Sequence, residues 1–406
     1  MSASPPGSGG SLTTRIGLLA SLYFSQGLPF GFFTQALPVL LRQQGASLPD
    51  IGLANLLALP WALKFLWAPW VDRRVAGATG GRRRFILPLQ AATALLLVAL
   101  AFLPSTQIPA LLAAVLLINL LAATQDVATD GLAVKLLTAT ERGAGSAVQV
   151  GAYRIGMIVG GGALLMVIAD LGQPGTFTVM AGLVALASLP ILRFRGVEPA
   201  GPAPQTLQFS WFSVPGAWRW LLLLVVYKLG DAVGSAMIRP LLVDRGLGLG
   251  EVGWLLGTIG STFGLLGALL GGALFSRLSR RSALVSAGVA QSLTLAGWAA
   301  VAAGLPDGWI GVVSALEHLG SGVATVTLFA TMMDAARREH AGTDYTIQAS
   351  AVVIATAAGG LVSGFVAEPL GYVPFFCFSA LVSLAGALTA IWLRPPVLTP
   401  VNRAPG

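Results

Sequence analysis

Long apolar runs recur along the whole chain, and they restrict the possible folds more than any other feature of the sequence. Each run is about 20 to 25 residues long, the length at which an α-helix crosses the hydrocarbon core of a bilayer. The twelve runs are 15–41, 49–70, 84–103, 108–132, 143–168, 176–192, 220–243, 251–275, 283–303, 309–332, 342–366 and 374–393. They predict an all-α integral membrane protein with twelve transmembrane helices and no room for a second soluble domain.

The composition agrees with a membrane location. Of the 406 residues, 55% are hydrophobic and 10% are charged, whereas about a quarter of the residues of a soluble domain are charged. Cys377 is the only cysteine, so no internal disulfide can form, and no Cys/His cluster has the spacing of a zinc site. We therefore expect no metal and no other cofactor, and a fold that is held by helix packing.

The runs divide into two sets of six. The longest polar interval contains the segment RGVEPAGPAPQ and lies between the sixth and seventh runs. The first run is too long for the apolar core of a signal peptide, so we interpret it as a retained span. We predict a flexible cytoplasmic N-terminus (1–15), an N-terminal six-helix half (16–194), a cytoplasmic linker (195–219), a C-terminal six-helix half (220–394) and a cytoplasmic tail (395–406).

The arginines of the loops indicate the orientation. If both termini are cytoplasmic, nearly all of them lie on the inner side, and only Arg42 and Arg245 lie outside. Lys and Arg in short loops are retained on the cytoplasmic side of a membrane, so this asymmetry predicts the topology. Because the basic residues lie at membrane edges rather than in a patch, their net charge of +8 does not indicate a nucleic-acid partner.

Loops with arginine clusters occupy corresponding places in the two halves. The segments APWVDRR (68–74) and GGRRR (80–84) follow the second span, and RLSRRS (277–282) follows the eighth. The first loop resembles the cytoplasmic loop between helices two and three in the major facilitator superfamily, which combines a helix-ending Asp with arginines. This resemblance implies a conformational latch made of Asp72, Arg73, Arg82 and Arg83. The alternative is that the arginines only anchor the loop on the inner side.

Five ionisable residues lie near the middle of predicted spans. Counting ~1.5 Å per residue from the nearest helix end, they are roughly 12 to 17 Å deep: Arg154, Lys228, Asp231, Glu317 and His318. Charges at this depth are costly and usually functional, so they predict a central polar cavity. We assign proton coupling to Asp231 and Glu317, because a carboxyl group there can bind and release a proton as the cavity alternates between wet and dry. The alternative for Asp231 is a structural pair with Lys228.

A second charged set lies closer to the cytoplasmic face. Asp126 and Asp130 are four residues apart, so they share one face of the fourth span. With Lys64 of the second span and Arg154 of the fifth, they form a predicted inner gate. The alternative is a static ion-pair network that ties these spans together.

Aromatic and amide side chains extend the predicted cavity. Tyr23 and Gln26 share one face of the first span with Phe30, and Trp61 lies one turn before Lys64. The Gln26 amide needs a partner in hydrocarbon, whereas helix packing explains Phe30 equally well. The complete set predicted to line the solute cavity is Tyr23, Gln26, Trp61, Lys64, Gln125, Arg154, Tyr227, Lys228, His318 and Gln348.

The sequence lacks the motifs of several enzyme classes. Gly248, Gly250 and Gly253 spell G-x-G-x-x-G, but a span follows them and no strand is predicted before them, so we interpret them as the loop that opens the eighth span. There is no G-x-S-x-G, H-E-x-x-H or P-loop pattern, and neither a hydrolase nor an ATP-driven pump is therefore encoded. We expect a transporter driven by a gradient and not an enzyme.

Longer segments resemble one branch of the major facilitator superfamily. They are PWALKFLWAPWVDRR (60–74), ATQDVATDGLAV (123–134), ERGAGSAVQVGAYRIGM (141–157), VVYKLGDAVG (225–234) and EHLGSGVAT (317–325). The branch includes the muropeptide permease AmpG and the acetyl-coenzyme A transporters. Within it, AGTDYTIQAS (341–350) is similar to the rhizobactin and pyochelin siderophore permeases. This similarity implies proton-coupled import of a siderophore, free or iron-loaded, by alternating access.

Two other functions stay open at this point. One is import of muropeptides, and the other is an integral-membrane enzyme or receptor that does not transport. For either transporter we expect a multi-pass monomer in a bacterial cytoplasmic membrane with both termini inside. Its partners would be a small-molecule solute, protons and the lipid bilayer.

Overall fold

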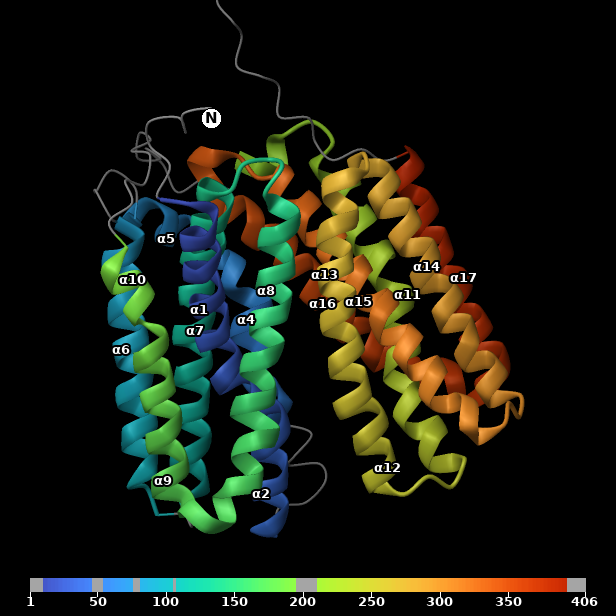
Figure 1. Ribbon diagram of the computed structural model, residues 1–406, viewed down its shortest axis with the longest axis horizontal. Coiled ribbons are helices and arrows are strands. Elements are labelled where there is room, and N and C mark those ends of the chain that lie inside the picture. The colour runs from blue at the N-terminus through green and yellow to red at the C-terminus, as the bar shows by residue number, and fades with distance from the viewer. Residues whose placement is uncertain (1–9, 46–53, 76–80, 105–106, 195–209, 393–406) are drawn as a thin grey trace, which may run out of the picture. The chain divides into compact units, whose positions relative to one another are not determined.

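The computed structural model describes residues 10–45, 54–75, 81–104, 107–194 and 210–392. Over these ranges the chain forms helices and no strand. The chain separates into two compact units, and each is described by itself below. Unit 1 comprises Met1–Thr138, Gly151–Gln208 and Arg338–Thr346, and unit 2 comprises Ala139–Val150, Phe209–Arg337 and Ile347–Gly406. In each unit the long helices run side by side (Figure 1).

Unit 1 contains most of the N-terminal helices. They are α1 (Leu12–Gly31), the π-helical η1 (Phe32–Ala36), α2 (Leu37–Gln43), η2 (Asn55–Ala58), α4 (Leu59–Leu63), η3 (Lys64–Leu66), α5 (Ala68–Val75), α6 (Gly81–Ala101), α7 (Ile108–Leu136), the π-helical η4 (Ile158–Ala163), α9 (Leu164–Ala187), α10 (Leu189–Arg193) and η8 (Arg338–His340).

Unit 2 contains most of the C-terminal helices. They are η5 (Ser210–Ser213), α11 (Ala217–Asp244), α12 (Leu249–Gly253), the π-helical η6 (Trp254–Ile259), α13 (Gly260–Arg277), α14 (Arg280–Ala302), η7 (Asp307–Trp309), α15 (Ile310–Asp334) and α17 (Tyr372–Trp392). Two helices, α8 (Arg142–Met157) and α16 (Ala341–Leu370), begin in one unit and end in the other.

Ten helical stretches of the described residues are long and apolar enough to cross a membrane, and they coincide with ten of the twelve predicted spans. The predicted span 49–70 differs, because Pro60 and Pro69 fall in a series of short helices rather than in one long helix. The predicted span 143–168 runs from α8 through η4 into α9. A kink at Gly172, whose φ is +64°, then separates it from the sixth span.

Several predicted boundaries differ from the structure by about one turn, and two of them concern charged residues. The third span begins at Gly81 and not at position 84, so Arg82 and Arg83 belong to its first turn. The fourth span continues past position 132 to Leu136. Its last turn includes Lys135, a cation that the negative end of a helix dipole favours.

The predicted domain limits remain a prediction. The start of the N-terminal segment, residues 195–209 of the linker and the whole C-terminal tail lie outside the described residues. The described end of the linker forms η5 and the first turn of α11.

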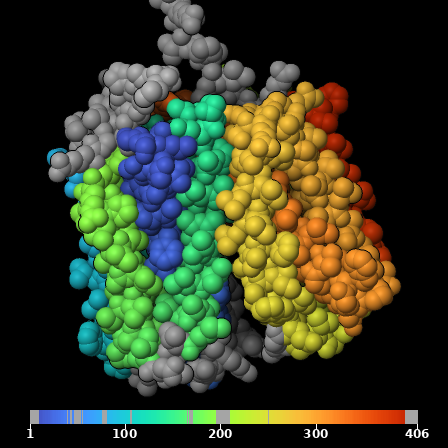
Figure 2. Space-filling model, viewed as in Figure 1, coloured from blue at the N-terminus to red at the C-terminus, as the bar shows by residue number. Residues whose placement is uncertain are grey.

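Glycines allow close helix packing in unit 1. A Cβ atom at Gly156 would lie within 3 Å of Gly27, and one at Gly160 would overlap the backbone of Leu28. Gly156 and Gly160 have the G-x-x-x-G spacing, which lets the backbones of two helices approach closely. On one face of unit 1, α1 lies between α8 and α9 (Figure 2), and a shallow apolar groove there is lined by Ala20, Ser21 and Phe24 together with side chains of α8 and α9.

Glycines also allow close helix packing in unit 2, between α13 and α15. A Cβ atom at Gly322 would lie 2.5 Å from the carbonyl oxygen of Gly264, so the two helices approach closely at this point. At one end of the unit, Trp298, Phe375 and Phe376 form an aromatic core with almost no exposure. These contacts fix α11 and α15, the helices that present the charged residues of unit 2.

Candidate functional site

The charged cluster of unit 1 consists of Lys64, Asp126 and Asp130. Lys64 forms an ion pair with Asp126, and its Nζ lies 4.0 Å from Oδ2 of Asp130. The phenol of Tyr23 donates a hydrogen bond of 2.8 Å to Oδ1 of Asp130. All four side chains are buried. Lys64 reaches the two carboxylates because η3 interrupts the second span, and the i, i+4 spacing on α7 presents both carboxylates on one face.

Amide side chains surround this cluster. Gln26 donates to Oγ1 of Thr129 at 3.1 Å, and Gln125 donates to Oγ of Ser25 at 3.4 Å. Gln90 donates to the same Ser25 oxygen at 3.0 Å. These bonds tie α1, α6 and α7 together around the carboxylates, so Gln26 has the partner that its place in a span requires.

Trp61 joins an aromatic group to the same cluster. Its indole nitrogen donates to Oδ1 of Asn119 at 3.2 Å, and Nζ of Lys64 lies 5.6 Å from its ring centroid, a cation–π contact. The rings of Phe30 and Tyr153 lie 5.3 and 6.1 Å from the Trp61 ring. Phe30 therefore packs inside unit 1. Arg154 follows Tyr153 on α8 with a half-buried side chain, and its part in a gate stays a prediction.

Asp72 caps the first turn of α16. Its carboxylate accepts backbone hydrogen bonds from Thr343 at 2.6 Å and from Gly342 at 3.2 Å, and Arg82 pairs with it at 3.1 Å. A helix N-terminus favours a carboxylate because its first N–H groups have no helical partner. A Cβ atom at Gly342 would lie 2.6 Å from Oδ1 of Asp72, so this contact requires glycine.

The other two predicted latch residues take no part in this contact. Arg73 is exposed and Arg83 is half-buried. The sequence singled out Asp72 and Arg82, but it could not show that the third partner is the backbone of a helix 270 residues away. The latching role of this contact stays a prediction.

An ion-pair cluster that we did not predict joins three segments of unit 2. Asp334, the last residue of α15, pairs with Arg142 and with Arg280, whose Nε lies 2.6 Å from Oδ2. Arg280 also donates to the carbonyl oxygen of Ala139 at 2.7 Å. Arg280 belongs to the predicted RLSRRS loop. An acidic residue that ends a span was the available signal for Asp334.

The midplane residues of unit 2 come together between α11 and α15. Lys228 pairs with Asp231 at 2.5 Å. Nδ1 of His318 lies 2.9 Å from Oε2 of Glu317, and it lies at the same distance from the carbonyl oxygen of Ser314. This cluster thus contains four residues that the sequence placed at one depth: Lys228, Asp231, Glu317 and His318.

Two hydroxyl groups that we did not predict complete this cluster. Ser235 lies between the two carboxylates, with Oγ at 3.3 Å from Asp231 and 3.5 Å from Glu317. Thr325 accepts a hydrogen bond of 3.2 Å from Lys228. Ser235 is four residues after Asp231, so helical spacing was its available signal.

Two predicted cavity residues have partners within unit 2. Tyr227 is buried and donates to the carbonyl oxygen of Leu284 at 3.0 Å. Gln348 is buried between Trp220, which donates to its amide oxygen at 2.6 Å, and Met332, whose carbonyl accepts from its amide nitrogen at 3.2 Å. Contact of either residue with a solute stays a prediction. Within the described ranges, no group of three His, Cys, Asp or Glu residues is placed to hold a metal ion.

The comparison with known families decides the identity of the fold. The sequence pattern described as Major Facilitator Superfamily matches residues 19–351. The chain is a member of the Major Facilitator Superfamily. The predicted fold class is therefore confirmed, and the protein is a multi-pass membrane transporter of this superfamily.

Relatives with assigned names place it in the predicted AmpG-like branch. An anhydromuropeptide permease of Escherichia coli strain K12 is 31% identical over 395 residues, which cover 94% of this chain and 80% of the permease. A putative transporter named AmpG 4 from Rickettsia conorii is 23% identical over 390 residues, which cover 91% of this chain and 94% of that protein.

Solved structures agree on the fold. The human organic anion transporter MFSD10 has a TM-score of 0.76 at 17% identity, covering 95% of this chain and all of that one. The Escherichia coli fucose:proton symporter FucP has a TM-score of 0.66 at 14% identity, covering 95% of this chain and all of that one. At these identities the similarity concerns the fold alone.

Proposed function

We propose that this transporter imports anhydromuropeptides, which are sugar-peptide fragments of the cell wall, across the cytoplasmic membrane of a bacterium. The observation that carries the proposal is the 31% identity to an anhydromuropeptide permease over 94% of the chain. This observation favours a muropeptide over the siderophore that the segment AGTDYTIQAS implies. The named relatives and the fold neighbours are transporters, which supports transport rather than catalysis.

The segment whose resemblance implied a siderophore, residues 341–350, makes contacts within the protein. In AGTDYTIQAS, the backbone of Gly342 and Thr343 donates to Asp72, and both ends of the Gln348 amide bond within unit 2. These contacts explain the residues without a solute. Siderophore import is therefore the second candidate, and the resemblance of this segment is its only support.

Proton coupling is proposed for the cluster of unit 2. The cluster holds two buried carboxylates, Asp231 and Glu317, but a single lysine, Lys228, which pairs with Asp231. An uncompensated charge is costly away from water. Binding of one proton to a carboxylate or to His318 brings the cluster to neutrality. Release of this proton when the cluster becomes exposed to water would couple the proton gradient to solute movement. Glu317, which contacts His318 directly, is the proposed carrier, and Asp231 is the proposed second site.

A gate and a latch are proposed for unit 1. Lys64, Asp126 and Asp130 would hold the inner path shut and separate when it opens, as alternating access requires. Asp72 and Arg82 would stabilise the shut state through the N-terminus of α16. Within this proposal the protein acts as a monomer with both termini in the cytoplasm.

Uptake by cells tests the proposed solute. Cells without a muropeptide permease of their own should gain uptake of radiolabelled anhydromuropeptide when they make this protein. Cells that make an equal amount of the Lys64→Ala variant should not gain it. The same cells should show no uptake of radioactive iron bound to pyochelin or rhizobactin. Iron uptake without muropeptide uptake would reject the proposal in favour of the siderophore.

A further inference from the structure

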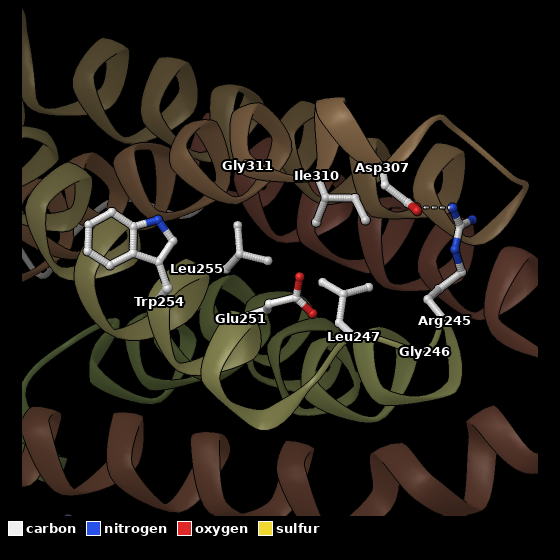
Figure 3. Close-up of a pocket in the computed structure, with 9 residues that line it drawn as sticks. All are labelled: Arg245, Gly246, Leu247, Glu251, Trp254, Leu255, Asp307, Ile310 and Gly311. Atoms are coloured by element: carbon white, nitrogen blue, oxygen red, sulfur yellow. Dashed lines mark hydrogen bonds and ion pairs between the residues drawn. The ribbon is translucent and has the colours of Figure 1, made fainter.

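A cavity of about 520 Å³ opens at the end of unit 2 where α11 stops. It is lined by the end of α11, by α12 with η6, and by the start of α15 (Figure 3). Its volume lies within the range of roughly 300 to 1,000 Å³ that small-molecule sites occupy. Arg277 and Arg280 lie at the opposite ends of the helices, so the predicted orientation places this cavity on the outer side.

The polar frame of this outer pocket is fixed by the protein itself. Arg245 donates to the carbonyl oxygens of Val301 at 2.6 Å and Leu305 at 3.0 Å, and it pairs with Asp307 at 2.8 Å. Gly246, with φ of +86°, forms the left-handed turn that ends α11 and brings the chain to α12. The guanidinium therefore bonds to groups of the protein itself, and it holds Asp307 at the rim of the pocket.

The polar groups that remain for a ligand are acceptors. Oε2 of Glu251 accepts the backbone N–H of Gly248 at 2.8 Å, and a carboxylate with one such bond can accept several more. Asp307 pairs through one oxygen while its side chain is 72% exposed. A ligand of this pocket must therefore donate hydrogen bonds, and the two carboxylates disfavour an anion.

The rest of the pocket is apolar and aromatic. Leu255 and Ile310 supply aliphatic side chains to its lining. Trp254 is the first residue of the π-helical η6, and it is 60% exposed. In Figure 3 its indole lies at the opposite end of the pocket from the Arg245–Asp307 pair, with Glu251 between them. The pocket thus combines an apolar aromatic surface with hydrogen-bond acceptors.

We propose that the outer pocket binds an amino-sugar ring of the incoming solute. A pyranose has an apolar C–H face, which suits the Trp254 indole, and a rim of hydroxyl and amide donors, which suits Glu251 and Asp307. The proposal rests on the proposed function, because an anhydromuropeptide carries amino sugars. By holding the sugar at the outer side, the pocket raises the apparent affinity of transport and leaves the maximal rate unchanged.

Binding of N-acetylglucosamine and its β-1,4-linked disaccharide tests the pocket directly. The probe binding is measured by saturation-transfer NMR on the full-length protein in lipid nanodiscs. Trp254→Leu and Glu251→Gln should each weaken binding about tenfold, equivalent to ~1.4 kcal/mol. Gln retains the oxygen that caps α12, so its loss of affinity reports the carboxylate. Trp309→Leu is the matched control, because Trp309 is 56% exposed at the start of α15 and does not line the pocket.

The outcomes distinguish a failure of the pocket proposal from a failure of the proposed function. In uptake assays Trp254→Leu should raise the KM for anhydromuropeptide about tenfold at unchanged maximal rate. Muropeptide uptake that none of these variants alters rejects the pocket and leaves the proposed function standing. Sugar binding that depends on Trp254, without muropeptide uptake by the wild-type protein, supports the pocket and rejects the function. Equal loss of binding in Trp309→Leu, or displacement of the sugar by phosphatidylethanolamine, identifies a lipid site and rejects the proposal.

Discussion

The charged clusters of the two units have similar charges but different surroundings. In unit 1, two aspartates share Lys64, and a tyrosine hydroxyl completes the cluster. In unit 2, Lys228 pairs with Asp231, whereas Glu317 contacts His318, whose side chain is 23% exposed. A serine and a threonine complete this cluster. The difference suggests separate tasks. The dry cluster of unit 1 suits a gate that is made and broken as a whole, and the cluster with a histidine suits exchange of a single proton.

The largest expected effect comes from removing the shared lysine of unit 1. Lys64→Ala leaves two carboxylates in a buried site without a cation, at a cost of about 3 to 5 kcal/mol. This cost is comparable to the difference between the states of a rocking transporter, so uptake should be abolished. The measurement is uptake of labelled solute by cells that contain equal amounts of each protein in the membrane.

A double variant is the control for that prediction. Lys64→Ala with Asp126→Ala removes one of the stranded charges and should recover part of the uptake. Normal uptake by Lys64→Ala alone would show that the unit 1 cluster has no part in the transport cycle.

A moderate effect is expected at the cap of α16. Arg82→Ala removes a charged hydrogen-bond partner of the buried Asp72, and such a bond contributes about 1.5 to 3 kcal/mol. The initial rate of uptake should fall roughly tenfold, and the melting temperature in detergent should fall by several degrees. Arg73→Ala changes an exposed neighbour and should leave both unchanged. If the two variants have equal uptake rates and equal melting temperatures, Arg82 has no special role and both arginines act only as cytoplasmic anchors.

The smallest effect should distinguish the hydroxyl groups of the two clusters. Tyr23→Phe removes a hydrogen bond of 2.8 Å to Asp130, and a loss of about 1 kcal/mol predicts a fall in uptake of roughly fivefold. Ser235→Ala removes longer contacts of 3.3 and 3.5 Å, so its effect should be smaller. A larger effect of Ser235→Ala would contradict the view that unit 1 has the more tightly closed cluster.

Apolar length predicted most of the fold, because a span must satisfy its backbone within one helix. The ten intact spans therefore follow from the sequence. The second span could not be predicted in detail. Its prolines are visible, but the change to η3 occurs at Lys64, which pairs with Asp126 of α7. This contact is a tertiary one, and local patterns do not contain it.

The parts of the site that could be predicted from the sequence are those that depend on depth in a span or on helical spacing. Asp126 and Asp130 share a face by their spacing. The sequence placed Asp231 and Glu317 at one depth, and the structure brings both to Ser235. The partners of Asp72 could not be found in this way. They are backbone N–H groups of a helix start, and any sequence supplies such groups. The pairing of Asp334 with Arg142 and Arg280 likewise depends on helix packing.

Reconstituted protein in liposomes gives the most direct test of this division of tasks. Two activities are compared with labelled anhydromuropeptide: accumulation driven by an imposed pH gradient, and exchange of labelled for unlabelled solute without a gradient. Glu317→Gln should lose accumulation and retain exchange, because it cannot release a proton but can still alternate. Lys64→Ala should lose both activities. Gradient-driven accumulation by Glu317→Gln at the wild-type rate would contradict the account, since the cluster of unit 2 would then not carry the proton.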